Sequence, residues 1–367
     1  MTDIAFFLRD LGGGGAEKAM LNLAAGFAEQ GLKVDLILVK YEGDYLSLVS
    51  PKVNLVKLSQ ERLATSLPFL VNYLRNVQPK VLISTLDDPN TIALLAKKLA
   101  NVSTRVIITV QTHITRSVQM TTQFKQRLTP LFVRWLYSWA DEIVAVSQGV
   151  AEDVIKITRL PQEKVKVIYN PIFSSNLLDK YNEPVNHPWF MDQQLPVILG
   201  VGRLEPQKDF PTLIRAFALV RQKYQARLVI LGQGKQLSNL IALVQELKLN
   251  EYVDFPGFVA NPHAYMAQAN LFVLSSVFEG FGNVLVEAML AGIPVVSTDC
   301  ESGPAEILGH GQYGKLAPVG DVTALADAML NTIQTNPDRQ LLRQRGCEFS
   351  LDAALSQYRQ IFNFDEY

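Results

Sequence analysis

The sequence predicts an α/β protein with two doubly wound parallel sheets. Short apolar runs of strand length alternate with helical patterns along the chain, which is typical of parallel sheets. The 367 residues exceed the roughly 250–300 residues that a single core usually supports. A polar segment with two prolines, Asn182–Trp189, separates the runs into two sets and is interpreted as a linker. We therefore expect two Rossmann-like domains of similar size that face a cleft.

The expected strands form one set for each domain. In the first half they are Ile4–Leu8, Val34–Val39, Val81–Ser84, Val106–Val110, Ile143–Val146 and Val165–Ile168. In the second half they are Val197–Val201, Leu228–Leu231, Val253–Phe255, Leu271–Leu274 and Val295–Ser297. The expected domains are residues 1–172 and 173–350. An amphipathic helix in the last segment, 351–367, is expected to pack back on the first domain.

Composition excludes several classes of protein. Hydrophobic residues make up 48% and charged residues 19%, and a net charge of −1 provides no basic field for nucleic acid. Cys300 and Cys347 lie far apart, so we expect no disulfide framework or metal-ligand cluster, and a reducing cytoplasm is the simplest location. The first residues lack the basic region of a signal peptide. No stretch approaches the roughly 20 apolar residues that span a bilayer.

Two glutamates eight residues apart are the most informative motif. Glu279 lies in the loop after the strand Leu271–Leu274, and Glu287 lies in the helix that follows. Ligands of doubly wound sheets bind at the carboxyl ends of strands. Two acids beside a helix N-terminus provide acceptors for hydroxyl groups next to amide donors for phosphate. The alternative is structural, with Glu287 on the helix surface and Glu279 interacting with the helix dipole.

Two cations follow the first strand of the second domain. Arg203 and Lys208 are five residues apart in a loop at the carboxyl end of that strand. An arginine can bind two phosphate oxygens at once and a lysine acts as a point charge, so the pair suits a diphosphate. Asp209 is expected to cap the next helix. The alternative is two solvated loop cations, and the nearby glutamate motif weakens it.

The first domain contributes two candidates. Gly12–Gly15 follow the first strand and open a helix that ends near Gly31, and glycines allow a backbone to approach phosphate closely. Glu17 or Lys18 stands where the dinucleotide fingerprint needs its third glycine, so NAD binding is not expected. His113 follows the strand Val106–Val110 and would face the cleft. The alternatives are a flexible turn and a structural histidine.

The segment Gln123–Trp139 is expected to form one helix in which basic and aromatic side chains alternate with aliphatic ones. This mixture suits a membrane interface, which would place the protein on anionic lipid at the inner face of the plasma membrane. The alternative is a core-packed helix whose cations extend along its surface.

Some motifs are absent from the sequence. It contains no Asp-x-Asp pair, HExxH, GxSxG or GxxxxGK[ST] pattern, so no metal–diphosphate clamp is expected. The glycine-rich first loop, His113, Gly202-Arg203-x4-Lys208 and Glu279-x7-Glu287 together resemble the retaining glycosyltransferases of family 4, which have the GT-B fold. The resemblance spans nearly the whole chain. The run Ser297–Leu308 also resembles a subgroup that acts on lipid-linked bacterial glycans.

The resemblance implies a role for each candidate. Arg203 and Lys208 would neutralise the donor diphosphate with no metal or other cofactor, Glu287 would bind the ribose hydroxyls, and His113 would contact the transferred sugar. Other residues would complete the donor site: Glu279, Gly280, Phe281, Gly282, Asn283 and Val284 around the sugar, Phe258 and Val259 beside the base, and Gly13, Gly14 and Gly15 near the phosphates or the acceptor.

The expected function is retaining transfer of a hexose or N-acetylhexosamine. The donor would be a nucleotide-sugar, UDP-linked, and the acceptor a glycan or lipid-linked glycan of surface polysaccharide or glycoconjugate biosynthesis. The donor phosphate itself would accept the acceptor's proton. Three alternatives are an NAD-dependent dehydrogenase, a non-hydrolytic nucleotide-sugar epimerase of the same fold, and a non-catalytic relative that binds a nucleotide-sugar. The missing third glycine opposes the first, and an epimerase would need further catalytic carboxylates or histidines.

Overall fold

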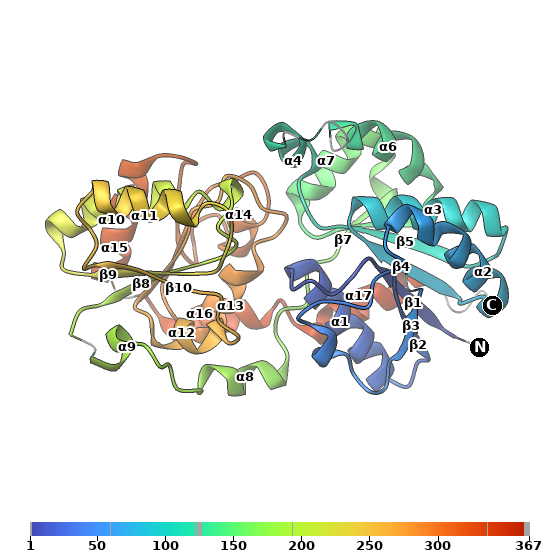
Figure 1. Ribbon diagram of the computed structural model, residues 1–367, viewed down its shortest axis with the longest axis horizontal. Coiled ribbons are helices and arrows are strands. Elements are labelled where there is room, and N and C mark those ends of the chain that lie inside the picture. Colours follow the sequence, from blue (N-terminus) through green and yellow to red (C-terminus); the bar gives the residue numbers. More distant parts are fainter. Residues whose placement is uncertain are drawn as a thin grey trace. The chain divides into compact units, whose positions relative to one another are not determined.

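The computed structural model describes residues 2–58, 60–121, 123, 127–192, 194–335 and 337–362. Within these ranges the chain divides into two compact units, each built on its own parallel sheet (Figure 1). The chain passes from the first unit to the second after Pro171 and returns to the first at Leu351. The expected α/β class with two doubly wound sheets is therefore confirmed.

The first unit contains a seven-stranded sheet in the order β3-β2-β1-β4-β5-β6-β7, with every neighbouring pair parallel. Its strands are β1 (Ile4–Leu8), β2 (Val34–Leu38), β3 (Asn54–Lys57), β4 (Val81–Thr85), β5 (Arg105–Val110), β6 (Glu142–Ala145) and β7 (Val165–Val167). The strand order reverses between β1 and β4. That reversal marks the place where doubly wound sheets open a crevice for ligands.

Helices cover both faces of this sheet (Figure 1). They are α1 (Gly15–Glu29), η1 (Leu46–Leu48), η2 (Leu63–Ser66), α2 (Leu67–Val77), α3 (Asp87–Ala100), α4 (Ile114–Met120), α6 (Thr129–Leu136), η3 (Tyr137–Trp139), α7 (Gln148–Thr158), η4 (Gln162–Lys164) and α17 (Leu351–Phe362). The last of these, α17, packs on α1. Its Phe362 ring lies 5.1 Å from the Phe27 ring, and a Cβ on Gly26 would come within 2.7 Å of Leu355. The C-terminal helix therefore completes the core of the first unit.

The second unit contains a six-stranded parallel sheet in the order β10-β9-β8-β11-β12-β13. Its strands are β8 (Val197–Val201), β9 (Arg227–Leu231), β10 (Val253–Gly257), β11 (Leu271–Leu274), β12 (Val295–Thr298) and β13 (Lys315–Ala317). Its helices are α8 (Ser175–Tyr181), α9 (Pro188–Asp192), η5 (Pro206–Lys208), α10 (Phe210–Lys223), α11 (Leu237–Glu246), α12 (Pro262–Gln268), α13 (Asn283–Ala291), α14 (Pro304–Ile307), α15 (Val322–Thr335) and α16 (Arg339–Cys347).

The interpretation of residues 182–189 as a linker is wrong. This segment lies inside the second unit, between α8 and α9. His187 is buried there, with Nε2 2.8 Å from Asp254 Oδ2, and its ring meets Phe190 edge-on. The prolines and polar residues therefore mark a turn between two helices of one unit.

The single helix expected over 123–139 is also wrong in its extent. The structure has a shorter helix, α6, followed by the 3-10 turn η3, and residues 122 and 124–126 lie outside the described ranges. Leu128 precedes α6 and Pro130 stands in its first turn, a position that proline favours. None of the helices that the structure describes is long and apolar enough to cross a bilayer.

Candidate functional site

The second sheet brings two of the predicted motifs together at its switch point. Strands β8 and β11 are neighbours, and the strand order reverses between them. The loop after β8 carries Arg203 and Lys208, and the loop after β11 carries Glu279. Parallel strands end at the same edge of a sheet, so both loops lie where doubly wound folds bind their ligands.

Lys208 and Glu279 form an ion pair between these two loops. The distance from Nζ to Oε1 is 2.5 Å, and the side chains are only 14% and 9% exposed. Ser276 donates a hydrogen bond to the same Oε1 at 2.6 Å. The aliphatic stem of Lys208 covers Gly202, where an added Cβ would come 3.2 Å from Cε. A buried carboxylate is costly unless it is paired, and here a cation and a hydroxyl satisfy it.

Hydrogen bonds tie the two loops to each other. Gln207 Nε2 donates to the carbonyl of Phe278 at 2.9 Å, and the amide of Val277 donates to the carbonyl of Gln207 at 2.8 Å. Ser275 Oγ donates to the carbonyl of Lys208 at 2.7 Å. These bonds join residues about 70 positions apart in the chain, so they fix the position of the Lys208 backbone relative to Glu279.

A third loop, after β12, supports the same site. Ser302 Oγ donates to the carbonyl of Glu279 at 2.8 Å. The next residue, Gly303, has φ of +90°, and a Cβ there would overlap the carbonyl oxygen of Phe281 at 1.8 Å. Only glycine fits this approach of two backbones. Cys300 in this loop is buried, and burial together with the charge of Glu279 raises the pKa of its thiol to about 12, so it is not a nucleophile at neutral pH.

The helix α13 begins directly after the Glu279 loop. Gly282 stands at its N-cap with φ of +103°, a left-handed conformation that favours glycine. Glu287 is buried on this helix, and Tyr181 donates to its backbone carbonyl at 2.7 Å. The Phe281 ring is also buried, with its centroid 5.3 Å from that of Phe349. The aromatic side chain therefore belongs to the core, and only the backbone at this position remains a candidate for ligand contact.

The remaining donor candidates lie at the same edge of the second sheet. Arg203 is exposed on the loop after β8. Phe258 is exposed and Val259 is half-buried after β10, which runs to Gly257 and so ends two residues later than expected. Asp209 accepts a bond from the amide of Thr212 at 3.4 Å, which confirms its expected role as a helix cap.

In the first unit the glycine-rich turn follows β1. Gly13 has φ of +92°, Gly14 is the N-cap of α1 and Gly15 is its first residue. A second turn braces this loop: the amide of Leu11 donates to the carbonyl of Glu42 at 3.0 Å, and a Cβ on Gly43 would lie 2.1 Å from the carbonyl oxygen of Leu11. The turn is therefore fixed by tertiary contacts, which opposes the interpretation of a freely flexible segment.

His113 lies at the carboxyl end of β5 and is the N-cap residue of α4. Its ring is buried, with Nδ1 3.3 Å from Oδ2 of Asp153, a buried residue on α7. Asp153 is not predicted from the sequence, because nothing in the local pattern of α7 distinguishes it from a surface acid.

A second acid that the sequence reasoning missed lies after β4. Leu86 has φ of +71°, which is unusual for a branched residue and turns the chain so that Asp87 begins α3. Tyr137 donates to Asp87 Oδ1 at 3.0 Å. Burial raises the pKa of the Asp87 carboxyl from 3.8 to about 6. The positive φ cannot be read from an ordinary Thr-Leu-Asp sequence, so no signal pointed to this turn.

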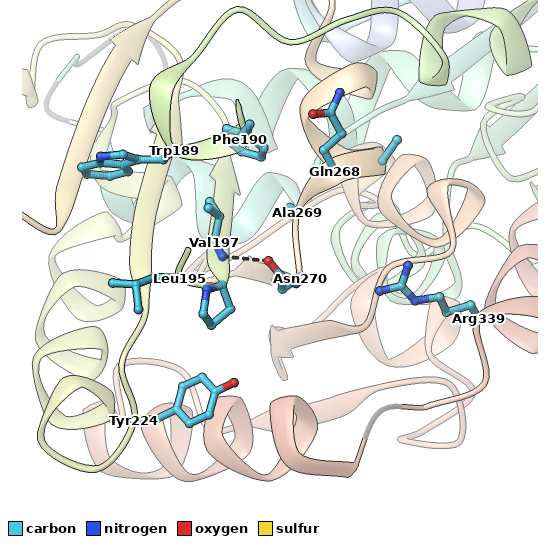
Figure 2. A pocket seen from close by; sticks show the side chains of 11 residues that line it. Trp189, Phe190, Leu195, Val197, Tyr224, Gln268, Ala269, Asn270 and Arg339 are labelled. Atoms are coloured by element: carbon cyan, nitrogen blue, oxygen red, sulfur yellow. Dashed lines mark hydrogen bonds between the residues drawn. The ribbon is translucent and has the colours of Figure 1, made fainter. Parts of the chain in front are cut away.

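The second unit contains a cavity of about 470 Å³. Figure 2 shows the side chains that line it. Pro196 and Val197 at the start of β8 line it, together with Asn270 just before β11, whose Oδ1 accepts a bond from the Val197 amide at 2.8 Å. Trp189, Phe190 and Tyr224 supply three aromatic rings. This cavity therefore lies at the amino ends of the strands, at the opposite edge of the sheet from Lys208 and Glu279. Among the described residues, no group of three or more His, Cys, Asp or Glu side chains is arranged to hold a metal ion.

Comparisons with known proteins match both halves of the chain. The family model described as Glycosyltransferase Family 4 matches residues 13–174, and the model described as Glycosyl transferases group 1 matches residues 187–349. A Campylobacter jejuni protein, N-acetylgalactosamine-N,N'-diacetylbacillosaminyl-diphospho-undecaprenol 4-alpha-N-acetylgalactosaminyltransferase, is 32% identical over 94% of each chain.

Solved structures agree with this fold. Anabaena Alr3699/HepE in complex with UDP-glucose has a TM-score of 0.79 at 22% identity and covers 98% of this chain and 99% of its own. The apo form of the lipopolysaccharide outer core galactosyltransferase WaaB has a TM-score of 0.75 at 21% identity and covers 100% of both chains.

Proposed function

The chain belongs to glycosyltransferase family 4 and has the GT-B fold, and from this premise we propose that it is a retaining hexosyltransferase that uses a UDP-sugar. It moves a hexose or N-acetylhexosamine to a glycan or lipid-linked acceptor. The Campylobacter jejuni relative carries a diphospho-undecaprenol acceptor in its name, and the Anabaena structure holds UDP-glucose. These two relatives support the choice of acceptor and of donor.

The observation that carries the proposal is the Lys208–Glu279 pair at the switch point of the second sheet. A lysine ammonium has three N–H donors, and Glu279 takes one of them. The others can donate to the oxygens of a donor diphosphate. The carboxylate of Glu279 in turn can accept hydrogen bonds from sugar hydroxyls. One ion pair thereby links the leaving group and the transferred sugar.

The chemistry that this arrangement favours is departure of a nucleoside diphosphate. Negative charge develops on the leaving phosphate as the glycosidic bond breaks, and fixed cations stabilise that charge. Lys208 and the exposed Arg203 supply two cations from one loop, so we propose that no metal or other cofactor is required. Glu287 binds the ribose hydroxyls, His113 contacts the sugar, and the donor phosphate accepts the proton of the acceptor hydroxyl.

Incubating the protein with a panel of UDP- and GDP-sugars and a lipid-diphosphate glycan acceptor tests this proposal. Transfer from a UDP-hexose or UDP-N-acetylhexosamine, with an α product from an α donor, is the expected result. The anomeric configuration is read from the proton coupling constant of the product. A β product rejects the retaining mechanism, and interconversion of the sugar without release of UDP supports an epimerase instead.

We also propose that α6 binds an anionic membrane surface, where the lipid-linked acceptor lies. Leu131, Phe132 and Trp135 on this helix are 56%, 53% and 71% exposed, while Val133 is buried and holds the helix on the unit. Exposed Arg134 lies among them. Aromatic side chains next to a cation suit the interface of an anionic bilayer. The exposure of these large side chains favours this interpretation over a core-packed helix.

Sedimentation with liposomes tests the membrane proposal. Vesicles that contain an anionic lipid are expected to retain the wild type, and a variant with Phe132→Ser and Trp135→Ser should lose most of that binding. Ile241→Ser, which changes an exposed apolar residue on α11 of the second unit, is the matched control and should bind as the wild type does. Equal binding of all three proteins, or none, contradicts the proposal.

A further inference from the structure

We propose that Asp153 positions His113 by holding the proton of the neutral ring on Nδ1, so that Nε2 presents a hydrogen-bond acceptor to a hydroxyl of the transferred sugar. This inference deepens the proposed function and rests on it for the identity of the sugar. The contact that supports it is the 3.3 Å distance between His113 Nδ1 and Asp153 Oδ2.

Asp153 is held firmly in place. It is 4% exposed in the second turn of α7, a helix capped by Ser147, whose Oγ accepts from the amide of Val150 at 3.2 Å. The amide of Thr115 donates to Asp153 Oδ2 at 3.0 Å, and Thr115 Oγ1 donates to Oδ1 at 2.5 Å. Both oxygens of the carboxylate therefore have partners in α4, and their position relative to the His113 ring is fixed.

Two neighbouring groups require opposite protonation states of His113 Nδ1. The amide of Arg116 lies 3.4 Å away and needs an unprotonated nitrogen as acceptor, whereas the Asp153 carboxylate needs a protonated one as donor. The two contacts are of nearly equal length, so charge decides between them: a hydrogen bond to a carboxylate is about twice as strong as one between neutral groups. The carboxylate therefore decides the tautomer. A neutral imidazole carries one N–H, so a proton on Nδ1 leaves Nε2 as an acceptor.

The rival explanation is that Asp153 only anchors α4 to α7 through Thr115. Three variants separate the two explanations. Asp153→Ala removes the acceptor for Nδ1–H and leaves the Arg116 amide as the partner of Nδ1. Asp153→Asn can keep its oxygen toward His113 and the Thr115 amide while its NH2 group donates to Thr115 Oγ1. Thr115→Val removes one bond to Asp153 and leaves the contact with His113 intact.

The tautomer is measured by long-range proton–nitrogen NMR on protein labelled with 15N-histidine. The chain has four histidines, so a His113→Gln variant assigns the signal. The wild type, Asp153→Asn and Thr115→Val are expected to carry the proton on Nδ1, and Asp153→Ala on Nε2. This readout needs no substrate, so a failure here is distinguishable from a failure of the proposed transfer reaction, which appears as a wild type inactive with every sugar.

The turnover number kcat should fall when the proton moves from Nδ1 to Nε2 of His113. We expect kcat to fall on the order of 10- to 100-fold in Asp153→Ala, by analogy with the loss found when the hydrogen-bond partner that orients a metal-bound histidine is removed. Asp153→Asn should lose less and Thr115→Val no more than about two-fold. A proton on Nε2 in the wild type, an unchanged tautomer in Asp153→Ala, or an equal loss in Thr115→Val overturns the proposal. Should Asp153→Ala fail to fold, the wild-type tautomer and the comparison of Asp153→Asn with Thr115→Val still decide it.

Discussion

Replacing Lys208 by methionine removes one charge and little else. Methionine keeps an apolar stem over Gly202, which the lysine stem covers in the wild type. The variant leaves the Glu279 carboxylate, 9% exposed, with the Ser276 hydroxyl as a partner. Removing one member of a buried pair costs about 3–5 kcal/mol. Because Glu279 keeps its hydrogen bond from Ser276, we expect a loss of unfolding free energy near the lower end of this range, about 3 kcal/mol. For a unit of this size, that loss corresponds to a melting temperature lower by roughly 6–12 °C.

The same substitution should lower catalysis for a different reason. Loss of a group that stabilises charge in the transition state costs about 10²–10³ in rate. Glu279→Gln in the Lys208→Met background removes the unpaired charge and should restore about 2 kcal/mol of the free energy of unfolding. It should restore no activity, because both proposed ligand contacts are then gone. Thermal melts and initial rates on the two single variants and the double variant check this. Recovery of kcat/KM in the double variant would refute the reasoning, because the pair would then be only structural.

Three further predictions concern buried side chains and close backbone contacts in the two units. Burial raises the pKa of Asp87 from 3.8 to about 6, so the folded state binds this proton more tightly than the unfolded chain does. The stability that this protonated carboxyl contributes is complete below pH 4 and is lost as the pH rises through 6. Asp87→Asn should therefore stabilise the protein at pH 8, by at most about 3 kcal/mol, and should not stabilise it at pH 4. Thermal melts at both pH values check this. Gly303→Ala forces a Cβ into the carbonyl of Phe281 and should lower the melting temperature and weaken UDP binding, whereas Gly320→Ala, with open space around its Cβ and φ of +75°, should leave UDP binding unchanged. Leu355→Ala on α17 creates a cavity against α1 and should cost about 2–5 kcal/mol in urea unfolding; a cost below 1 kcal/mol would mean that the helix adds little to the core of the first unit.

The strands that the sequence predicts well are those buried on both faces. β1, β8 and β11 have the expected bounds, because a continuous apolar run between polar loops has one interpretation in a parallel sheet. The edge strands β3 and β13 were missed. β3 has exposed residues at both ends and β13 has three residues, so neither leaves an apolar run in the sequence.

The candidate site was predictable where its residues lie in one loop and not where they meet across loops. Lys208 and Glu279 were identified separately from their spacing within motifs, but their ion pair joins positions 71 residues apart. The carboxylate of Asp153 likewise acts on His113, a neighbour that only the fold supplies. The local sequence around such residues carries no trace of these contacts.

Titration of UDP into the wild type and the Lys208→Met variant, both in the presence of EDTA, tests the central claim most directly. The loop cations of the second unit are proposed to hold the donor diphosphate without a metal. Calorimetry should show UDP binding to the wild type in EDTA and at least tenfold weaker binding to Lys208→Met, since a charged hydrogen bond contributes about 1.5–3 kcal/mol. Equal affinities for the two proteins, or wild-type binding that disappears in EDTA, would contradict it.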